Sequence, residues 1–296
     1  MVYVVDDYLE DNEMTSQLQQ TEGHLDGGVF YRSWRGQSPI KAVILLAHGL
    51  GEHCGRYQAF ADYFCQHGVA VVALDHVGHG ASPGRRVHIT SFDDFLGPLE
   101  ALRDLVDQWY PQLPCFLVGH SMGGLIAARF LLDHQHRFAG AALSAAALQV
   151  PEMPSRFSLL LIRFFSWCMP TMGALQLDAS QVSRDPMVVE RYLADPLVHN
   201  GKASARLVAQ LFNAMQKVEG ECGQITLPIL LLHGDADKMT PYRGSKAFHQ
   251  GAGSLDKTLK IYPGLFHEIF NEPEQLEVMG DLRAWLEDRL DGARDS

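Results

Sequence analysis

Cys115-Phe-Leu-Val-Gly-His-Ser-Met-Gly-Gly-Leu-Ile-Ala-Ala-Arg129 is the stretch that decides the fold. Its apolar start predicts a buried strand, the glycines around Ser121 predict a tight turn, and a helix-forming run follows. A serine at the apex of such a turn has a strained backbone. The flanking glycines are needed because a side chain at either position would collide with the neighbouring strand or helix. The geometry exposes the Ser121 hydroxyl, so we predict that this serine is a nucleophile.

Apolar runs of strand length recur on both sides of this stretch and alternate with segments of helical pattern. Because the runs are continuously apolar, they are typical of strands buried on both faces of a parallel sheet. The alternation predicts an α/β protein with a mostly parallel, doubly wound sheet. Strands are expected over 27–36, 42–47, 69–74, 115–118, 139–147, 227–232 and 257–262, and helices over 57–67, 92–110, 242–249 and 273–290.

The rhythm breaks between residues 150 and 220, where helical segments interrupted by proline replace the buried strands. We predict that residues 150–220 are an inserted helical cap on a core formed by 21–149 and 221–296, and that residues 1–20 are a poorly ordered tail. Within the cap, Ser155 to Met169 is dense in Leu, Ile, Phe and Trp. One interpretation is that this segment packs on the core. The other is that part of it lines an apolar substrate entrance or touches lipid, and the two interpretations are compatible.

The composition limits the classes of partner that the protein could bind. The chain has 24 Lys and Arg against 35 Asp and Glu, a net charge of −11, and no basic block, which argues against nucleic acid as a partner. Anionic membranes should repel it, so transient membrane contact through the cap would have to be hydrophobic. The five cysteines form no Cys-x-x-Cys pair, and we see neither a signal-peptide pattern nor an apolar run of membrane-spanning length. The expected location is cytoplasmic, with a peripheral membrane position open.

A serine hydroxyl is a poor nucleophile unless a base takes its proton, and a carboxylate must orient that base. Functional residues of α/β sheets gather at the carboxyl ends of strands, and Asp237 and His267 both follow strands. The order Ser121, Asp237, His267 is the one expected of a nucleophile elbow. The tetrahedral intermediate also needs two N–H donors, for which we predict Met122 and Leu50.

Two alternatives bear on this set of residues. Asp235 follows the same strand as Asp237, but Asp237 lies further out on the loop and can reach the histidine. The pairs His76-Val-Gly-His79 and His134-Gln-His136 lack a third metal ligand at usable spacing, so we interpret them as structural. The predicted chemistry needs neither a metal nor an organic cofactor.

With these residues identified, the chain resembles an α/β-hydrolase of the monoacylglycerol lipase and lysophospholipase group, from about residue 20 to 290. The resemblance implies a serine esterase in which Asp237 and His267 complete the triad and Leu50 and Met122 form the oxyanion hole. The matching segments are His48-Gly-Leu-Gly-Glu-His-Cys-Gly-Arg-Tyr57, Asp75-His-Val-Gly-His-Gly80, Gly119-His-Ser-Met-Gly-Gly124, His233-Gly-Asp-Ala-Asp237, Gly264-Leu-Phe-His267, Ser183-Arg-Asp-Pro186 and Tyr192-Leu-Ala-Asp-Pro196.

The resemblance also implies a polar end for the substrate's alcohol, built from Glu52, Arg56 and Tyr192. For Glu52 and Arg56 the alternative is a structural ion pair that braces the oxyanion loop. Monoacylglycerol lipases often carry a second histidine three residues after the catalytic one, and here that position is Phe270. A strict preference for glycerol esters is therefore open.

The leading hypothesis is a serine carboxylic ester hydrolase that cleaves a lipid-like monoester, a monoacylglycerol or lysophospholipid, through an acyl-enzyme. One alternative is a serine aminopeptidase of the proline iminopeptidase type, in which acidic cap residues such as Glu190 and Asp195 would hold a free amino terminus. A second alternative is a non-catalytic ligand-binding member of the fold.

Overall fold

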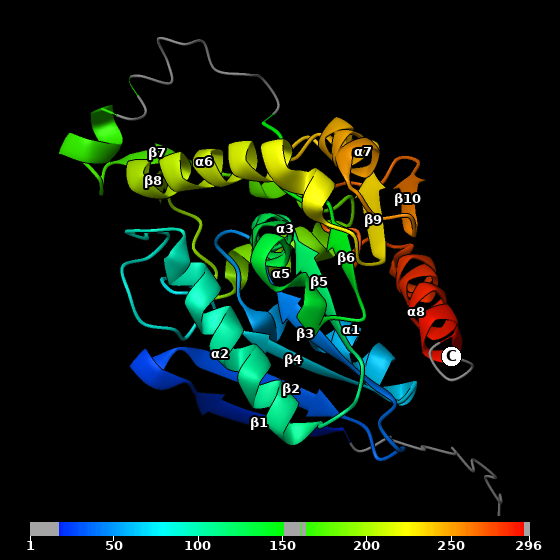
Figure 1. The fold of residues 1–296 in the computed structure, drawn as a ribbon. Helices are drawn as coiled ribbons and strands as arrows, with labels where there is room; N and C mark the ends of the chain where they lie inside the picture. Colours follow the sequence, from blue (N-terminus) through cyan, green and yellow to red (C-terminus); the bar gives the residue numbers. More distant parts are fainter. Residues whose placement is uncertain (1–17, 151–160, 162–163, 293–296) are drawn as a thin grey trace, which may run out of the picture.

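A twisted eight-stranded sheet with helices on both sides forms the body of the protein (Figure 1). The computed structural model describes residues 18–150, 161 and 164–292. The strand order is β1-β2-β4-β3-β5-β6-β9-β10; β1 and β2 run antiparallel to their neighbours, and the other pairs are parallel. The strands are β1 (Gln19–His24), β2 (Phe30–Arg35), β3 (Ala42–Ala47), β4 (Val69–Leu74), β5 (Cys115–His120), β6 (Gly140–Ser144), β9 (Ile229–Gly234) and β10 (Lys257–Tyr262). The predicted fold class is confirmed.

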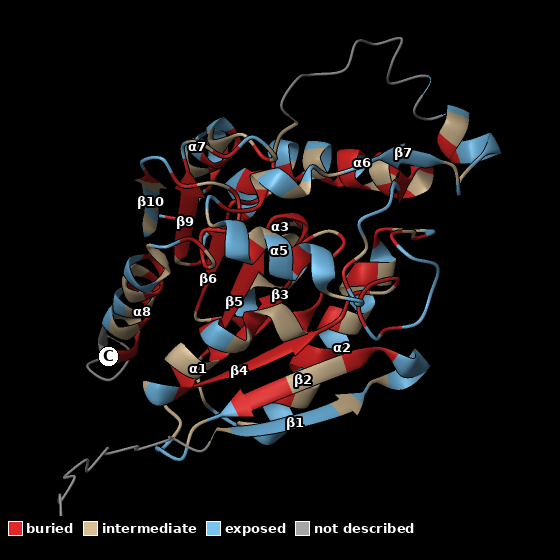
Figure 2. Ribbon diagram, turned by 180° about the vertical axis from the view of Figure 1, so that it is seen from behind, coloured by how far each residue is buried: buried red, intermediate tan, exposed pale blue. Residues whose placement is uncertain are grey.

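The central strands are continuously apolar because both of their faces are covered. In β3, Val43 and Leu45 belong to one hydrophobic cluster, whereas Ile44 and Leu46 belong to another on the opposite face. All six residues of β3 are buried, and Figure 2 shows the same for its neighbours in the sheet. This burial on two faces produced the sequence signal by which β3, β4, β5 and β9 could be predicted.

Helices complete the two clusters. The helices α1 (Gln58–Gln66) and α8 (Gln275–Gly292) contribute to one cluster. The other cluster takes residues from α2 (Asp93–Trp109), α3 (Met122–His134), α6 (Ala205–Glu221) and α7 (Tyr242–Gly251). Short 3₁₀ helices lie at Asp26–Gly28, Cys54–Tyr57, Gln135–Arg137, Ala179–Gln181 and Cys222–Gln224.

Between β6 and α6 the chain leaves the main sheet. The helix α5 (Pro186–Ala194) starts where the Asp185 carboxylate accepts the Met187 N–H, 2.9 Å away. The short strands β7 (Gly173–Leu175) and β8 (Ala203–Ser204) pair with each other, which the purely helical prediction for this region missed. Residues 164–168 are helical, and most of the apolar segment from Ser155 to Met169 lies outside the described residues.

Two details qualify the predicted division of the chain. Gln19 and Gln20 fall in the expected tail but pair with β2, so that tail was drawn too long; residues 1–17 lie outside the described part. The helix α6 lies in the range predicted as the cap, yet it packs on α3 and joins the core. The boundaries at residues 150 and 220 stay a prediction.

Candidate active site

Ser121 lies at the sharp turn between β5 and α3, with a φ of 55° and a ψ of −118°. Its N–H donates to the Ser144 carbonyl at 2.9 Å, which fixes the turn against the end of β6. The flanking glycines are required by space: a Cβ on Gly119 would lie 2.4 Å from the Gly123 carbonyl oxygen, and one on Gly123 would lie 2.0 Å from that of Ala47. The predicted elbow geometry is present.

Three side chains from three loops meet at this turn. His267 Nε2 lies 2.8 Å from Ser121 Oγ, and His267 Nδ1 lies 2.7 Å from Asp237 Oδ2. All three residues are buried. Ser121 follows β5, Asp237 follows β9 and His267 follows β10, so the carboxyl ends of the strands bring them together. This arrangement can move the serine proton to the imidazole and stabilise the imidazolium.

The orientation of Asp237 is fixed by its own loop. Its Oδ1 accepts the N–H groups of Met239 at 2.8 Å and Thr240 at 3.0 Å, and its Oδ2 lies 3.2 Å from His233 Nε2. Asp235 instead accepts the N–H of Gly264 at 2.6 Å. Asp237, not Asp235, therefore faces the histidine, as the sequence favoured.

Charge and burial set the protonation states of His267 and Asp237. Burial by itself would lower the pKa of His267, but the Asp237 carboxylate, together with Glu268 and Glu52, raises it overall. Burial would likewise raise the pKa of Asp237, yet its contacts with His267, His233 and Thr240 hold it well below the usual range. Asp237 is therefore ionised beside an imidazole that can accept a proton.

Hydrogen bonds to both the N–H and the carbonyl of Gly49 hold the loop after β3. The Gly49 N–H donates to Glu52 Oε1 at 2.6 Å. His48 Nε2 accepts the His76 N–H at 2.9 Å, so the ring proton is on Nδ1, which donates to the Gly49 carbonyl at 2.8 Å. The amide that shares this trans peptide with the Gly49 carbonyl belongs to Leu50, and it points the opposite way.

Leu50 and Met122, the two predicted oxyanion donors, both lie beside Ser121. Leu50 lines the same pocket as Ser121. Met122 is the first residue of α3, so its N–H is among those that have no acceptor within their own helix. The pocket holds about 10 Å³, and its apolar lining includes Leu177, Val182, Met239 and Tyr192. Apolar side chains therefore face the Ser121 hydroxyl together with the polar groups of Glu52, His120, His267 and Glu268, an arrangement that could carry acyl transfer to the serine.

Comparisons with known proteins agree with this geometry. Residues 38–274 match the family described as serine aminopeptidase, S33. The chain is 37% identical over 266 residues to the monoacylglycerol lipase of Mycolicibacterium smegmatis, covering 89% of this chain and 95% of that protein. It is 35% identical over 264 residues to human monoglyceride lipase, covering 88% and 87%.

The chain belongs to the monoglyceride lipase group of this α/β-hydrolase family. A solved structure agrees: the monoacylglycerol lipase of Paleococcus ferrophilus superposes with a TM-score of 0.78 at 31% identity, covering 92% of this chain and 99% of that one. The resemblance stated from the motifs is thereby confirmed.

Among the residues that the monoglyceride lipase resemblance assigned to the alcohol end, Glu52 and Arg56 form a close ion pair. Arg56 Nη1 lies 2.6 Å from Glu52 Oε2, and the guanidinium lies 4.6 Å from the centre of the Tyr192 ring. Tyr192 and Glu52 also line the Ser121 pocket. The ion pair that was the alternative for Glu52 and Arg56 is present, and Glu52 and Tyr192 line the Ser121 pocket; that these residues bind the substrate's alcohol stays a prediction.

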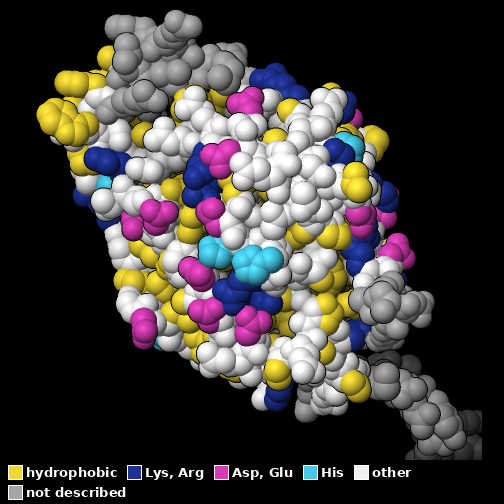
Figure 3. Space-filling model, viewed as in Figure 1, with side chains coloured by type: hydrophobic (Ala, Val, Ile, Leu, Met, Phe, Trp, Pro, Cys, Tyr) yellow, Lys and Arg dark blue, Asp and Glu magenta, His cyan; other side chains and the backbone are white. Residues whose placement is uncertain are grey.

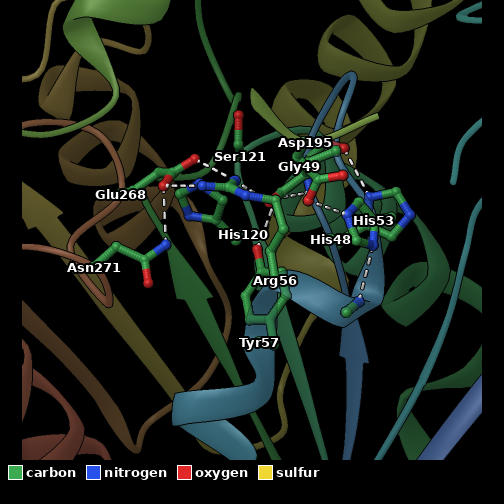
Figure 4. A network of polar contacts seen from close by, with 12 residues as sticks. His48, Gly49, His53, Arg56, Tyr57, His120, Ser121, Asp195, Glu268 and Asn271 are labelled. Atoms are coloured by element: carbon green, nitrogen blue, oxygen red, sulfur yellow. Dashed lines mark hydrogen bonds and ion pairs between the residues drawn. The ribbon is translucent and has the colours of Figure 1, made fainter. Parts of the chain in front are cut away.

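The sequence reasoning missed Glu268, which follows His267 directly. Its carboxylate makes a bidentate ion pair with Arg56 at 2.6 and 2.8 Å (Figure 4). No local pattern marks this residue, because its partner lies 212 positions away. Its place beside the predicted base was the only available signal.

Phe270, at the position where this group often has a second histidine, packs away from the reacting groups. It is 5% exposed and its ring centre lies 5.0 Å from that of Phe60 in the core. In the described ranges no cluster of three or more His, Cys, Asp or Glu residues could hold a metal. Likewise, none of the described helices is long and apolar enough to cross a membrane.

Proposed function

We propose that this protein hydrolyses monoacylglycerols through an acyl-enzyme, with Ser121 as nucleophile, His267 as general base and acid, and Asp237 as the orienting carboxylate. The observation that carries the proposal is the hydrogen-bonded line from Ser121 Oγ through His267 to Asp237, at 2.8 and 2.7 Å. The strained turn at Ser121 supports it, because such strain persists where it serves a site.

In the first half of the reaction, Ser121 Oγ attacks the ester carbonyl carbon while His267 Nε2 takes its proton. The negative oxygen of the tetrahedral intermediate receives hydrogen bonds from the N–H groups of Leu50 and Met122. His267 then gives the proton to the departing alcohol oxygen as the C–O bond breaks. In the second half, His267 deprotonates a water that attacks the acyl carbon, and Ser121 recovers the proton as the fatty acid leaves.

The substrate class draws on the relatives and on charge. The relatives in bacteria and in humans are named as lipases of monoacylglycerols or monoglycerides. Two carboxylates, Glu52 and Glu268, line the pocket and share the single guanidinium of Arg56, which leaves one net negative charge. A phosphorylated alcohol would be repelled there, so we favour monoacylglycerols over lysophospholipids.

A fluorophosphonate probe and a panel of monoesters test the proposal together. The wild-type protein should be labelled and should hydrolyse monoacylglycerols of graded chain length faster than the matching lysophospholipids. Ser121→Ala should abolish labelling and reduce turnover by a factor of about 10⁴ or more. Labelling that persists in Ser121→Ala would refute the mechanism, and faster cleavage of lysophospholipids would refute the substrate class.

The aminopeptidase alternative has less support in the cap. Glu190 is exposed, and Asp195 lies 2.8 Å from His53 Nε2, so neither lines the Ser121 pocket. Comparing a p-nitrophenyl ester with a proline anilide separates the two activities. Absence of turnover on both would favour the non-catalytic alternative.

We also propose transient contact of the cap with lipid. Phe164, Trp167 and Met169 are exposed by 55%, 78% and 49%. Figure 3 shows hydrophobic side chains gathered at that end of the molecule. With a net charge of −11 the attraction would be hydrophobic, toward neutral lipid. The cytoplasmic location stays a prediction.

A further inference from the structure

We infer that Glu268 is a positioning residue that locks the loop carrying His267 to the loop carrying the Leu50 amide. The inference rests on the proposed function, because it concerns how the loop of the general base and the loop of the oxyanion donor are held relative to each other. It assigns to Glu268 a role that neither the motifs nor the resemblance suggested.

At the Glu268 end the carboxylate is fully engaged. Its Oε1 accepts from Arg56 Nη1 at 2.6 Å, and its Oε2 accepts from Arg56 Nη2 at 2.8 Å and from Asn271 Nδ2 at 2.9 Å. In Figure 4 the Arg56 guanidinium points at Glu268, with Asn271 beside it. The Glu268 N–H donates to the Val182 carbonyl at 2.7 Å, so its backbone is fixed as well.

At the other end, Arg56 reaches the oxyanion loop through Glu52. Arg56 Nη1 also donates to Glu52 Oε2 at 2.6 Å. Glu52 Oε1 accepts the Gly49 N–H at 2.6 Å and the Tyr57 hydroxyl at 2.8 Å. A continuous line of charge-assisted hydrogen bonds therefore runs from the residue after His267 to the residue before Leu50.

Burial makes this line stiff. Glu52 and Glu268 are 4% and 5% exposed. Burial by itself would raise the pKa of Glu52, but the Arg56 guanidinium lowers it overall, so the group is charged. An arginine can hold two carboxylates because it has several donors in a rigid plane, whereas a lysine would act as a point charge. Removing one carboxylate frees the guanidinium to turn toward the other, and the two loops lose their common anchor.

Glu268 also acts on His267 through its charge. The groups that face the His267 imidazole are Ser121 and Asp237 by hydrogen bonds, the Thr240 hydroxyl 3.3 Å from Nδ1, the His120 ring at 4.8 Å, and the carboxylates of Glu268 and Glu52. Both of these carboxylates raise the pKa of His267. Replacing Glu268 by its neutral isostere should therefore lower that pKa, an effect that loss of a brace alone would not produce.

The experiment compares Glu268→Gln, Glu52→Gln and their double variant with Glu274→Gln, a control whose carboxylate pairs with Arg184 near the surface. We expect Glu268→Gln to reduce kcat about 10- to 100-fold with little change in KM, less than outright loss of an oxyanion donor. The acidic limb of kcat/KM should move to lower pH. The double variant should lose less than the product of the single losses, because both act through Arg56. Glu274→Gln should match the wild type.

A Glu268→Gln variant with wild-type kcat and pH profile would overturn the inference. So would a loss of kcat that only follows a loss of folded protein, with the pH profile unmoved. An inactive, unlabelled wild-type protein would instead refute the proposed function, and this role with it. Arg56→Lys gives a further check: a variant that keeps the charge but not the fork should show the kcat loss of Glu268→Gln.

Discussion

Ser121 shows how one residue carries local strain so that a hydroxyl can be presented. A non-glycine residue at a φ of 55° and a ψ of −118° costs on the order of 1–3 kcal/mol. Hydrogen bonds offset part of that cost, since the Ser121 N–H donates to Ser144 and the Ser121 carbonyl accepts from Leu125 and Ala147. The turn is therefore held by its surroundings and needs no movement before reaction.

The pH dependence of kcat/KM should report His267. The base must be neutral to accept the serine proton, so activity is lost as the pH falls through its pKa. Although burial opposes it, the Asp237 carboxylate raises that pKa. We therefore expect an acidic limb with a midpoint above about 6.5, the ordinary value for histidine. Initial rates on a soluble p-nitrophenyl ester between about pH 5 and 9 give this midpoint.

Asp237→Asn is the matched variant for that profile. Without the carboxylate the midpoint should move to lower pH, and kcat should fall by about 10⁴ because the imidazole loses its orienting partner. Asp235→Asn changes the neighbouring carboxylate, which contacts Gly264 and not His267, and should keep the wild-type profile. A wild-type midpoint well below 6.5 would contradict the assignment of charge in this site.

Residues that follow strands could be predicted, and residues that act by pairing across the chain could not. Ser121, Asp237 and His267 each stand after an apolar run that the sequence displays. Glu268 has no such mark, since its meaning depends on Arg56 in a distant loop. Phe270 could be seen as a departure from the group's pattern, but only its packing on Phe60 shows that it serves the core.

At the scale of elements, burial decides which strands can be recognised. β3, β4, β5 and β9 are buried along their whole lengths, so their sequences are continuous apolar runs. β1 is an exposed edge strand of polar residues, which lacks both the apolar run and the alternation. β7 and β8 are only three and two residues long, too short to leave a periodic pattern.

The close approach of α3 to β3 makes Gly123 a test of the elbow. An alanine there would place its Cβ 2.0 Å from the Ala47 carbonyl oxygen and 2.5 Å from that of His48, both rigid backbone atoms. We expect Gly123→Ala to lower the free energy of unfolding by at least about 2 kcal/mol and to reduce esterase activity, since the helix must move from the oxyanion loop. Urea denaturation and ester turnover measure the two effects.

Gly220→Ala is the control within a helix. A Cβ at Gly220 meets nothing within 4 Å, and the residue lies in α6. It should raise the free energy of unfolding by about 0.5–1 kcal/mol and leave turnover unchanged. Equal free energies of unfolding for Gly123→Ala and Gly220→Ala would contradict the close packing of Gly123 against the Ala47 and His48 carbonyls.

At the scale of the whole molecule, the substrate must gain access to the buried Ser121. The pocket around Ser121 holds about 10 Å³, room for roughly one water, so we expect residues that line it to move when a monoacylglycerol binds. Several of those residues, Leu177, Val182 and Tyr192, belong to the region between β6 and α6. His53 to Asp195 and Gly51 to His199 join that region to the oxyanion loop at 2.8 and 2.7 Å, and these contacts resist opening.

Lipid contact through the region between β6 and α6 depends both on its exposed apolar side chains and on the net charge of the whole protein. Trp167 is 78% exposed, and an indole ring gains most at the boundary between water and lipid. We expect the protein to sediment with neutral phosphatidylcholine vesicles and less with anionic ones, because it carries a net charge of −11. Trp167→Glu should weaken binding to neutral vesicles by about tenfold, as expected when an interfacial aromatic is replaced by a charge.

Leu255→Glu is the matched control, because it introduces the same charge at a fully exposed position in the loop before β10, which lies on the opposite side of the molecule from β7 and β8 (Figure 1). It should bind vesicles as the wild type does, and both variants should keep turnover on a dissolved short-chain ester, because neither residue lines the Ser121 pocket. If the two variants lost vesicle binding equally, net charge alone would govern adsorption. The exposed aromatic residues of the cap would then have no part in bringing this enzyme to its substrate.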